Sequence, residues 1–288
     1  MLSIVIVGFL IGACTANFEK LLPDASICGY QNINELKQNY VSLYEFPWMV
    51  HVKLTYLDLE YEFAERCSGV LISERYVLTN AYCGSDAVKV ILGEYQTNES
   101  RTCHGSICTE PKKEIKIEEF IRDGKRENGP YDFGLLRLQE KVTFSDFIKP
   151  ICLNFNEKKL SKELIVSGWG ASNSHGVVKK RMEYKVIPDE ICYQEEQFLK
   201  NNVELANVSF ICSISKNTNK ESACGGDHGG PFMYKSDSNQ WFAEGVIIEV
   251  MYDEDDTNHF NTCSKERPIN GIRITDNVIE WILSSIRS

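Results

Sequence analysis

The chain has 288 residues, of which 43% are hydrophobic and 25% are charged, so it can bury a large core as one or two domains. This composition is typical of a globular protein, and the chain has no low-complexity tract. The formal net charge of −10 disfavours nucleic acid as a partner, because phosphate binding needs clustered Lys and Arg.

Residues 2–13 form an apolar run that is followed by Cys14, Thr15 and Ala16. The run is shorter than the ~20 apolar residues that cross a bilayer. Its length and the small residue Ala16 are typical of a secretory signal peptide, so we predict that residues 1–16 are removed. No later segment is apolar enough to anchor the chain in a membrane, and we expect a secreted, extracellular protein.

Removal of this peptide takes away Cys14 and leaves ten of the 11 cysteines. An even number of cysteines in a secreted chain predicts disulfides, here five. The alternative is a zinc site, but the chain has no Cys-x-x-Cys pair and its five histidines are scattered. We therefore expect no metal at the cysteines, and their spacing alone leaves the pairing open.

The predicted secondary structure is almost entirely β. After an irregular stretch to about residue 44, short runs rich in β-branched and aromatic residues alternate with Gly, Asn, Asp and Ser clusters. The predicted strands cover residues 48–52, 70–72, 76–78, 88–92, 133–138, 164–166 and 242–251. Asp276 is the predicted cap of a helix over residues 277–287, whose apolar face consists of Val278, Ile279, Ile282 and Ile286. This pattern favours an all-β sandwich or barrels with a C-terminal helix.

Three segments stand out for their chemistry. They are residues 67–83, which end Thr79-Asn80-Ala81-Tyr82-Cys83, residues 131–138, and residues 224–231, which read Cys-Gly-Gly-Asp-His-Gly-Gly-Pro. With residues 46–48, 150–152 and 168–170, their order resembles the chymotrypsin-like serine proteases over residues 28–288. The resemblance implies two six-stranded antiparallel β-barrels, at about residues 41–150 and 151–275, with the catalytic triad in the cleft between them.

The resemblance also divides the chain. Residues 17–40 correspond to a light-chain-like segment, and residues 41–288 correspond to the peptidase domain with its C-terminal helix. Arthropod haemolymph proteases of this family often carry a clip domain, but residues 17–27 leave no room for one.

Two of the three catalytic positions carry the wrong residue types. Tyr82 stands where the family has its histidine base and His228 where it has its serine nucleophile, while Asp132 matches the orienting aspartate. A serine hydroxyl reacts only when a base with a pKa near neutral takes its proton. Tyrosine, with a pKa of about 10, is protonated at neutral pH and cannot be that base. The resemblance therefore implies an inactive serine protease homologue.

The activation machinery is changed as well. The family's zymogens are cut before Ile-Val-Gly-Gly, and the corresponding residues 34–40 have neither the glycines nor an apolar new terminus. Asp227, in the oxyanion-turn remnant Gly226-Asp227-His228, matches the carboxylate that pairs with the released terminus. An unpaired buried carboxylate is costly. Asp227 is therefore expected either to find a local donor or to stay exposed in a zymogen-like loop.

The specificity pocket departs from the family pattern too. Ser222 stands at the pocket base, where trypsin-type enzymes have aspartate, and Ile248, Glu249 and Val250 replace Ser-Trp-Gly on the substrate-binding strand. Val250 puts a branched side chain at the pocket mouth, so no working pocket for basic side chains is expected.

The resemblance further implies how the cysteines pair. Cys67 pairs with Cys83, Cys28 with Cys152, Cys192 with Cys212, Cys224 with Cys263 and, as the remaining pair, Cys103 with Cys108.

Several other side chains are candidates for ligands or modification. His228 could be a metal ligand or relocated base beside Asp132 and Tyr82, but a tight zinc site needs three or four ligands. Glu94 lies in a loop that binds calcium in some family members, and residues 253–256 form an acidic run that is a solvated loop by default. Asn98 and Asn207 begin glycosylation sequons.

These observations predict a binding function. The expected protein is a regulator, decoy or cofactor in an extracellular protease cascade such as melanisation in innate immunity, with a protease or zymogen as partner and no cofactor. The loops around the inactive cleft are the expected contact surface. One alternative is an unconventional hydrolase that uses His228. Another is a small-ligand carrier, which an apolar cavity would indicate.

Overall fold

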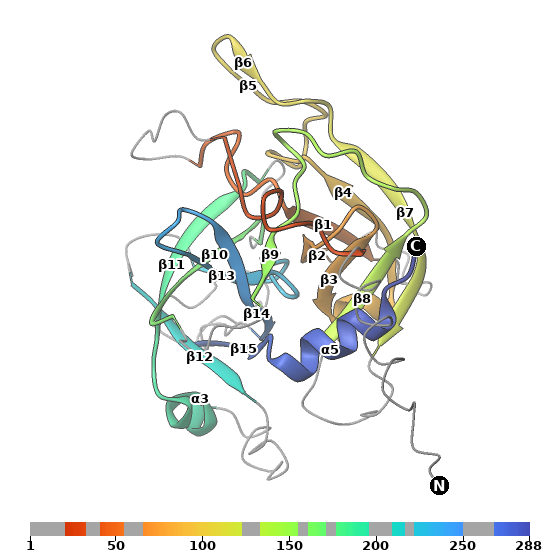
Figure 1. Ribbon diagram of the computed structural model, residues 1–288. Coiled ribbons are helices and arrows are strands. Elements are labelled where there is room, and N and C mark those ends of the chain that lie inside the picture. The colour runs from red at the N-terminus through yellow and green to blue at the C-terminus, as the bar shows by residue number, and fades with distance from the viewer. Residues whose placement is uncertain are drawn as a thin grey trace, which may run out of the picture.

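The computed structural model describes residues 21–32, 41–54, 66–122, 133–154, 161–170, 177–195, 209–216, 222–249 and 268–288. Two β-barrels lie side by side, and the C-terminal helix runs beneath the first of them (Figure 1). The hairpin of β5 (Cys103–His104) and β6 (Ile107–Cys108) projects from the opposite end (Figure 1).

The first barrel is a closed sheet of six antiparallel strands. In order around the barrel, they are β1 (Met49–Leu54), β2 (Arg66–Leu71), β3 (Tyr76–Asn80), β8 (Phe133–Leu138), β7 (Lys113–Arg122) and β4 (Ala87–Leu92). The short helix α2 (Ala81–Ser85) follows β3 directly. Every residue of β3 and β8 is buried, including the polar residues Thr79, Asn80 and Arg137 among the apolar ones.

The second barrel also closes with six antiparallel strands, because β13 pairs with both β10 and β14. In order, they are β13 (Pro231–Lys235), β10 (Glu163–Gly168), β11 (Lys180–Val186), β12 (Phe210–Ser215), β15 (Ile269–Arg273) and β14 (Trp241–Glu249). The short strand β9 (Cys152–Leu153) joins the edge of β14 in parallel, and α3 (Asp189–Glu195) follows β11. The predicted fold of two six-stranded antiparallel barrels is confirmed.

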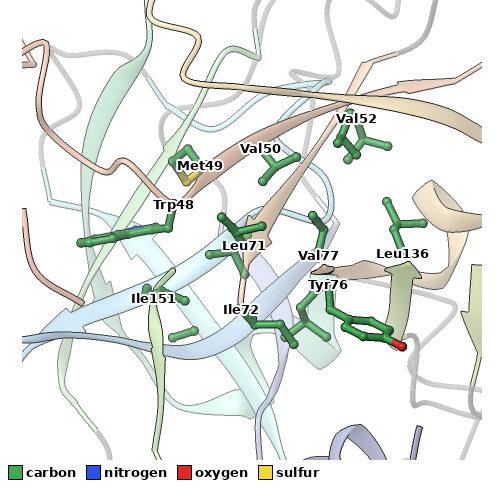
Figure 2. Close-up of a cluster of buried hydrophobic side chains, with 14 of the residues drawn as sticks. Trp48, Met49, Val50, Val52, Leu71, Ile72, Tyr76, Val77, Leu136 and Ile151 are labelled. Atoms are coloured by element: carbon green, nitrogen blue, oxygen red, sulfur yellow. The ribbon is translucent and has the colours of Figure 1, made fainter. Parts of the chain in front are cut away.

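The core of the first barrel continues into the space between the barrels. Trp48 is fully buried and Tyr76 is 1% exposed, and both belong to the cluster of aliphatic side chains from β1, β2, β3 and β8 in Figure 2. Burial of this apolar surface is the main force that holds the fold together.

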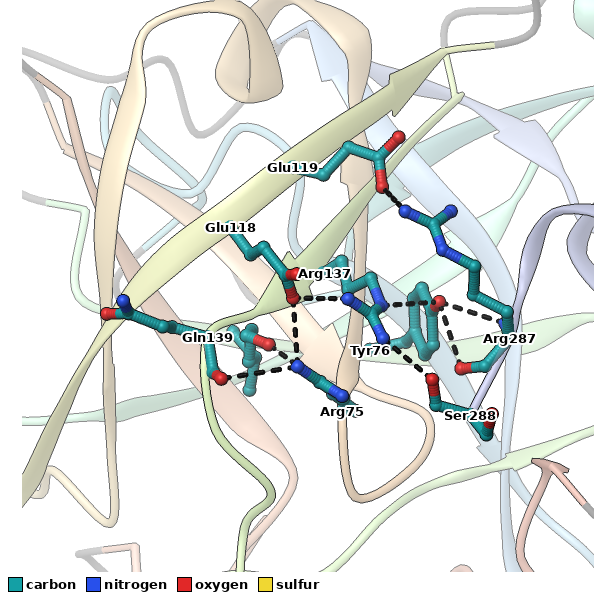
Figure 3. Close-up of polar contacts among 9 residues, drawn as sticks. Arg75, Tyr76, Glu118, Glu119, Arg137, Gln139, Arg287 and Ser288 are labelled. Atoms are coloured by element: carbon teal, nitrogen blue, oxygen red, sulfur yellow. Dashed lines mark hydrogen bonds and ion pairs between the residues drawn. The ribbon is translucent and has the colours of Figure 1, made fainter.

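Helix α5 (Asp276–Ser285) confirms the predicted C-terminal helix but corrects its ends. Its N-cap is Thr275 rather than Asp276, because the first helical hydrogen bond runs from the Ile279 amide to the Thr275 carbonyl at 2.9 Å. The helix stops at Ser285, before the predicted end at residue 287. Beyond it, the Arg287 amide donates to the Tyr76 hydroxyl at 2.9 Å and so attaches the chain to the first barrel (Figure 3).

Candidate functional site

Tyr82 lies in α2 at the junction of the two barrels, and it is 51% exposed. Asn80 fixes this helix as its N-cap, since its Oδ1 accepts from the Cys83 amide at 2.8 Å. The Asn80 Nδ2 also donates to the Ile247 carbonyl of β14 at 3.2 Å. The segment that carries Tyr82 is therefore anchored in both barrels.

The turn that carries His228 is wedged between the same elements. The Ser68 amide of β2 donates to the His228 carbonyl at 2.8 Å, and the Gly229 amide donates to the Ile247 carbonyl at 2.9 Å. Gly229 has φ +77, and a Cβ there would lie 2.1 Å from Thr79 Oγ1. Only glycine fits this close approach in the left-handed region.

These contacts bring His228 and α2 to one site, as the sequence motifs predicted. The His228 Nδ1 lies 3.2 Å from the Ile248 carbonyl, and because a carbonyl only accepts, Nδ1 carries the proton and donates it. The imidazole is half-buried and is directed onto the backbone of the predicted substrate-binding strand. Of the other predicted site residues, Asp132, Val250 and the Glu249 side chain lie outside what the structure describes.

Asp227 has found local donors, which decides between the two alternatives for this residue. Its carboxylate is fully buried; Oδ1 accepts from the Gly170 amide at 2.7 Å and Oδ2 from the Cys224 amide at 3.0 Å. The Lys180 ammonium lies 3.7 Å from Oδ2. A Cβ at Gly168 or Gly170 would lie 2.0 or 2.4 Å from the carboxylate oxygens, so both glycines leave space for this side chain.

Ser222, at the predicted pocket base, is only 5% exposed and forms a hydrogen bond with a buried residue of the second barrel. Its hydroxyl lies 2.9 Å from the hydroxyl of Tyr184 on β11, which accepts from the Ala223 amide at 2.8 Å. Burial raises the pKa of Tyr184, so its hydroxyl stays protonated and can donate to Ser222. The serine hydroxyl thus has a partner within the protein.

A Trypsin family model matches residues 37–269. The chain belongs to the trypsin family. Among known trypsin-family proteins, it is 30% identical to Serine protease 7 of Drosophila melanogaster, over 94% of this chain and 70% of that protein. It is 28% identical to Phenoloxidase-activating factor 3 of Holotrichia diomphalia, over 95% of this chain and 78% of that protein.

The fold comparison agrees with this membership. The crystal structure of the Drosophila Grass clip serine protease of the Toll pathway superposes with a TM-score of 0.73 at 23% identity. The match covers 93% of this chain and 77% of that one. At this identity, the likeness shows the trypsin-family fold alone.

Four disulfides of this trypsin-family chain lie wholly within the described residues. They are Cys28–Cys152, Cys67–Cys83, Cys103–Cys108 and Cys192–Cys212, the pairs that the resemblance implied. Cys224 is disulfide-bonded too, and its expected partner Cys263 lies outside the described part of the chain. Cys67–Cys83 joins β2 to α2 and so holds Tyr82 against the first barrel.

Glu94 was a candidate calcium ligand in the sequence, and both of its carboxylate oxygens have partners within the protein. Oε2 lies 2.5 Å from His51 Nδ1, and Oε1 accepts from the Lys112 ammonium at 2.8 Å. Glu94 is only 3% exposed. Burial alone would raise the pKa of Glu94, but the hydrogen bonds and charges of His51 and Lys112 hold it below its usual value.

The other predicted ligand sites can be located only in part. Within the described ranges, no group of three or more His, Cys, Asp or Glu side chains could hold a metal ion. Residues 253–256 and Asn207 lie outside those ranges, whereas Asn98 is exposed on a turn. Among the described helices, none is long and apolar enough to cross a membrane.

An apolar hollow of about 80 Å³ lies beside the Cys28–Cys152 disulfide. Leu22, Ile72, Leu153 and Phe242 contribute to its lining. A pocket for a drug-sized molecule measures ~300–1,000 Å³, so this hollow does not favour a small-ligand carrier.

Sequence reasoning missed three residues that hold the site together, Asn80, Lys180 and Tyr184. A signal existed for Asn80, because asparagine three residues before Cys83 is a typical N-cap. No local signal marked Lys180 or Tyr184, because their partners come from distant loops.

Proposed function

We propose that this chain is a secreted, non-catalytic member of the trypsin family that acts by binding another extracellular protein. The observation that carries the proposal concerns His228, which lies in the turn where the family has its nucleophile and donates a hydrogen bond from Nδ1 to the Ile248 carbonyl. An imidazole in this position has no hydroxyl to form an acyl-enzyme. Tyr82, in the helix that should carry the base, has a phenol in place of an imidazole, and an ordinary phenol, with a pKa of about 10, is a poor base for activating a nucleophile or a water at neutral pH.

The pocket contacts support the same proposal. Ser222 supplies no charge at the pocket base, and its hydroxyl is bonded to Tyr184. A basic substrate side chain would therefore meet no carboxylate there. The glycine-rich turn and α2 nevertheless keep a defined shape, which is what a binding surface needs.

The relatives suggest the class of partner. They include proteins named Phenoloxidase-activating factor 3 and Melanization protease 1. By analogy, the partner of this chain is a protease or zymogen of an extracellular cascade, and the chain serves as its regulator, cofactor or decoy. The disulfides support secretion, because such bonds persist in oxidising compartments. The exposed turn at Asn98 is accessible to glycosylation, and the Lys112 ammonium donates to the Glu94 carboxylate.

Two assays on the purified protein test the loss of catalysis. Incubation with a broad peptide library and with a fluorophosphonate probe is expected to give neither turnover nor labelling. Turnover by the wild-type chain that disappears in a His228→Ala variant would instead establish the unconventional hydrolase.

A reconstituted cascade tests the binding role. The chain is added to a purified phenoloxidase-activating protease and its zymogen substrate, and the rate of zymogen cleavage is followed. The proposal expects the wild type and His228→Ala to change this rate equally. No effect across the cascade steps, together with no binding to their purified components, would reject this class of partner.

A further inference from the structure

The buried Asp227 carboxylate poses a question that the loss of catalysis does not answer. In the family that this chain resembles, the corresponding carboxylate pairs with an ammonium that appears only when the zymogen is cut. Residues 34–40 of this chain carry neither the glycines nor the apolar terminus of that cleavage site. A buried carboxylate still needs a positive partner or several donors.

Lys180 provides that positive charge from inside the second barrel. It is the first residue of β11, and it lies on the same strand face as Met182 and Tyr184, which are both buried. This position directs the lysine stem inward, so that its side chain is only 11% exposed. The ammonium lies 3.7 Å from Asp227 Oδ2, donates to the Ser222 carbonyl at 3.3 Å and also donates to the Gly170 carbonyl.

The same ammonium therefore joins the two loops that surround Asp227. Gly170, two residues after the end of β10, donates its amide to Asp227 and accepts from Lys180 through its carbonyl. Residues 222–227, the other loop, provide the Cys224 amide and the Ser222 carbonyl. Tyr184, two residues after Met182 on the same face of β11, forms hydrogen bonds with Ser222 and Ala223. The strand thus fixes the whole segment before the His228 turn.

We propose that Lys180 replaces the terminal ammonium of the family, so that the uncut chain already has its final conformation at residues 222–230. The chain then needs no proteolytic cleavage to order this turn. The inference does not depend on the proposed function, because it concerns the conformation of the turn and not what the turn binds.

Hydrogen exchange of the uncut protein, followed by mass spectrometry, tests the inference. We expect the peptide that covers residues 222–230 to be protected in the uncut wild type. Lys180→Gln keeps a polar side chain of similar reach but removes the charge. It is expected to raise the exchange rate of this peptide about tenfold, since a hydrogen bond to a charged group is worth a factor of this order.

The matched control is Lys185→Gln, because Lys185 lies on the same strand but is exposed. Its exchange in residues 222–230 should match that of the wild type. Protection of β3 and β8 serves as the folding check in every variant. Equal exchange in Lys180→Gln and Lys185→Gln would reject the role of Lys180.

Two further measurements separate the alternatives. If Lys180 acts through Asp227, adding Asp227→Asn to Lys180→Gln changes exchange much less than the two separate effects combined. If the effects of the two substitutions on exchange are fully additive, Lys180 binds only the two carbonyls. That result would overturn the proposal that Lys180 replaces the terminal ammonium. A specific protease site built into residues 34–40 then allows cleavage, which should leave the protection unchanged. A turn that becomes protected only after this cleavage would overturn the inference as well.

Discussion

Replacing Lys112 by methionine removes the ammonium that faces the buried Glu94 carboxylate while it keeps most of the aliphatic stem. Glu94 then keeps its contact with His51, which lies 2.5 Å from Oε2, but its Oε1 loses the hydrogen bond of 2.8 Å from Lys112. The Thr97 carbonyl loses its bond from Lys112 as well, at 3.0 Å. The variant therefore leaves a carboxylate oxygen and a carbonyl of one loop without their cationic donor.

The expected cost follows from the burial of the two partners. A hydrogen bond to a charged group contributes about 1.5–3 kcal/mol, and breaking a fully buried ion pair costs about 3–5 kcal/mol. The side chain of Glu94 is 1% exposed but that of Lys112 is 17% exposed, so solvent compensates in part. We expect a loss of about 2 kcal/mol, which lowers the melting temperature of a domain of this size by about 4–8 °C.

Thermal unfolding at neutral pH measures this loss, and Lys89→Met is the matched control. The Lys89–Glu114 pair has a similar separation of 2.6 Å, but its side chains are 40% and 47% exposed. Exposed pairs contribute about 0–1 kcal/mol, so the control should shift the melting temperature far less. Equal shifts in the two variants would refute the reasoning from burial.

Calcium and acid supply two further arms of the same experiment. Because Lys112 occupies Glu94, addition or chelation of calcium should leave the melting temperature of the wild type unchanged. A clear drop in the melting temperature of the wild type on chelation would contradict the role of Lys112 as the partner of Glu94. The pKa of Glu94 lies below its usual value, so its contribution is complete above that usual value and is lost as the pH falls through the folded-state pKa. The difference in melting temperature between the wild type and Lys112→Met should become smaller as the pH falls through the folded-state pKa of Glu94.

Three other predictions concern separate parts of the structure. Burial lowers the pKa of Lys179 to about 8, so the unfolded chain binds more protons between pH 8 and the usual lysine pKa and stability rises with pH there. Urea unfolding of Lys179→Met should lack this rise, which is about 3 kcal/mol at most. Arg137 is 6% exposed and binds the Tyr76 hydroxyl and the Ser288 carbonyl (Figure 3). Arg137→Met should therefore lower the free energy of unfolding by about 2–3 kcal/mol, as measured by urea unfolding. A loss below about 1 kcal/mol would contradict this role of Arg137. Fluorophosphonate labelling should be absent in His228→Ser and appear only when Tyr82→His is added, because the serine nucleophile and the histidine base act together. Labelling of the single variant His228→Ser would refute this expectation.

Several apolar strands could be predicted from the sequence, but the mostly buried strands β12, β13 and β15 were missed, and so was the half-polar strand β11. Four of residues 133–138 are apolar, and this run predicts the strand that the structure has as β8. Strand β11, by contrast, alternates between buried Met182 and Tyr184 and exposed Arg181, Glu183 and Lys185. Its polar half gives a weak local signal, and only pairing with β10 and β12 fixes it as a strand.

The candidate site divides in the same way. The positions of Tyr82 and His228 follow from local motifs, which a sequence displays directly. The partners of Asp227 and Glu94 do not, because Lys180 and Lys112 come close only through the pairing of strands and loops. The sequence could state that Asp227 needed a donor, but the choice among the 31 Lys and Arg residues required the fold.

The survival of the glycine-rich turn is explained by packing alone. Gly229 is required because a Cβ would meet Thr79 Oγ1 at 2.1 Å, and Gly168 and Gly170 are required because Asp227 lies against them. Asp227 in turn is held by two amides and the Lys180 ammonium, none of which depends on the residue at position 228. The frame of the turn can therefore persist with histidine in place of a nucleophile. A matching glycine pattern around this position is then a sign of the trypsin fold, and the chemistry depends instead on side chains such as those at positions 82 and 228.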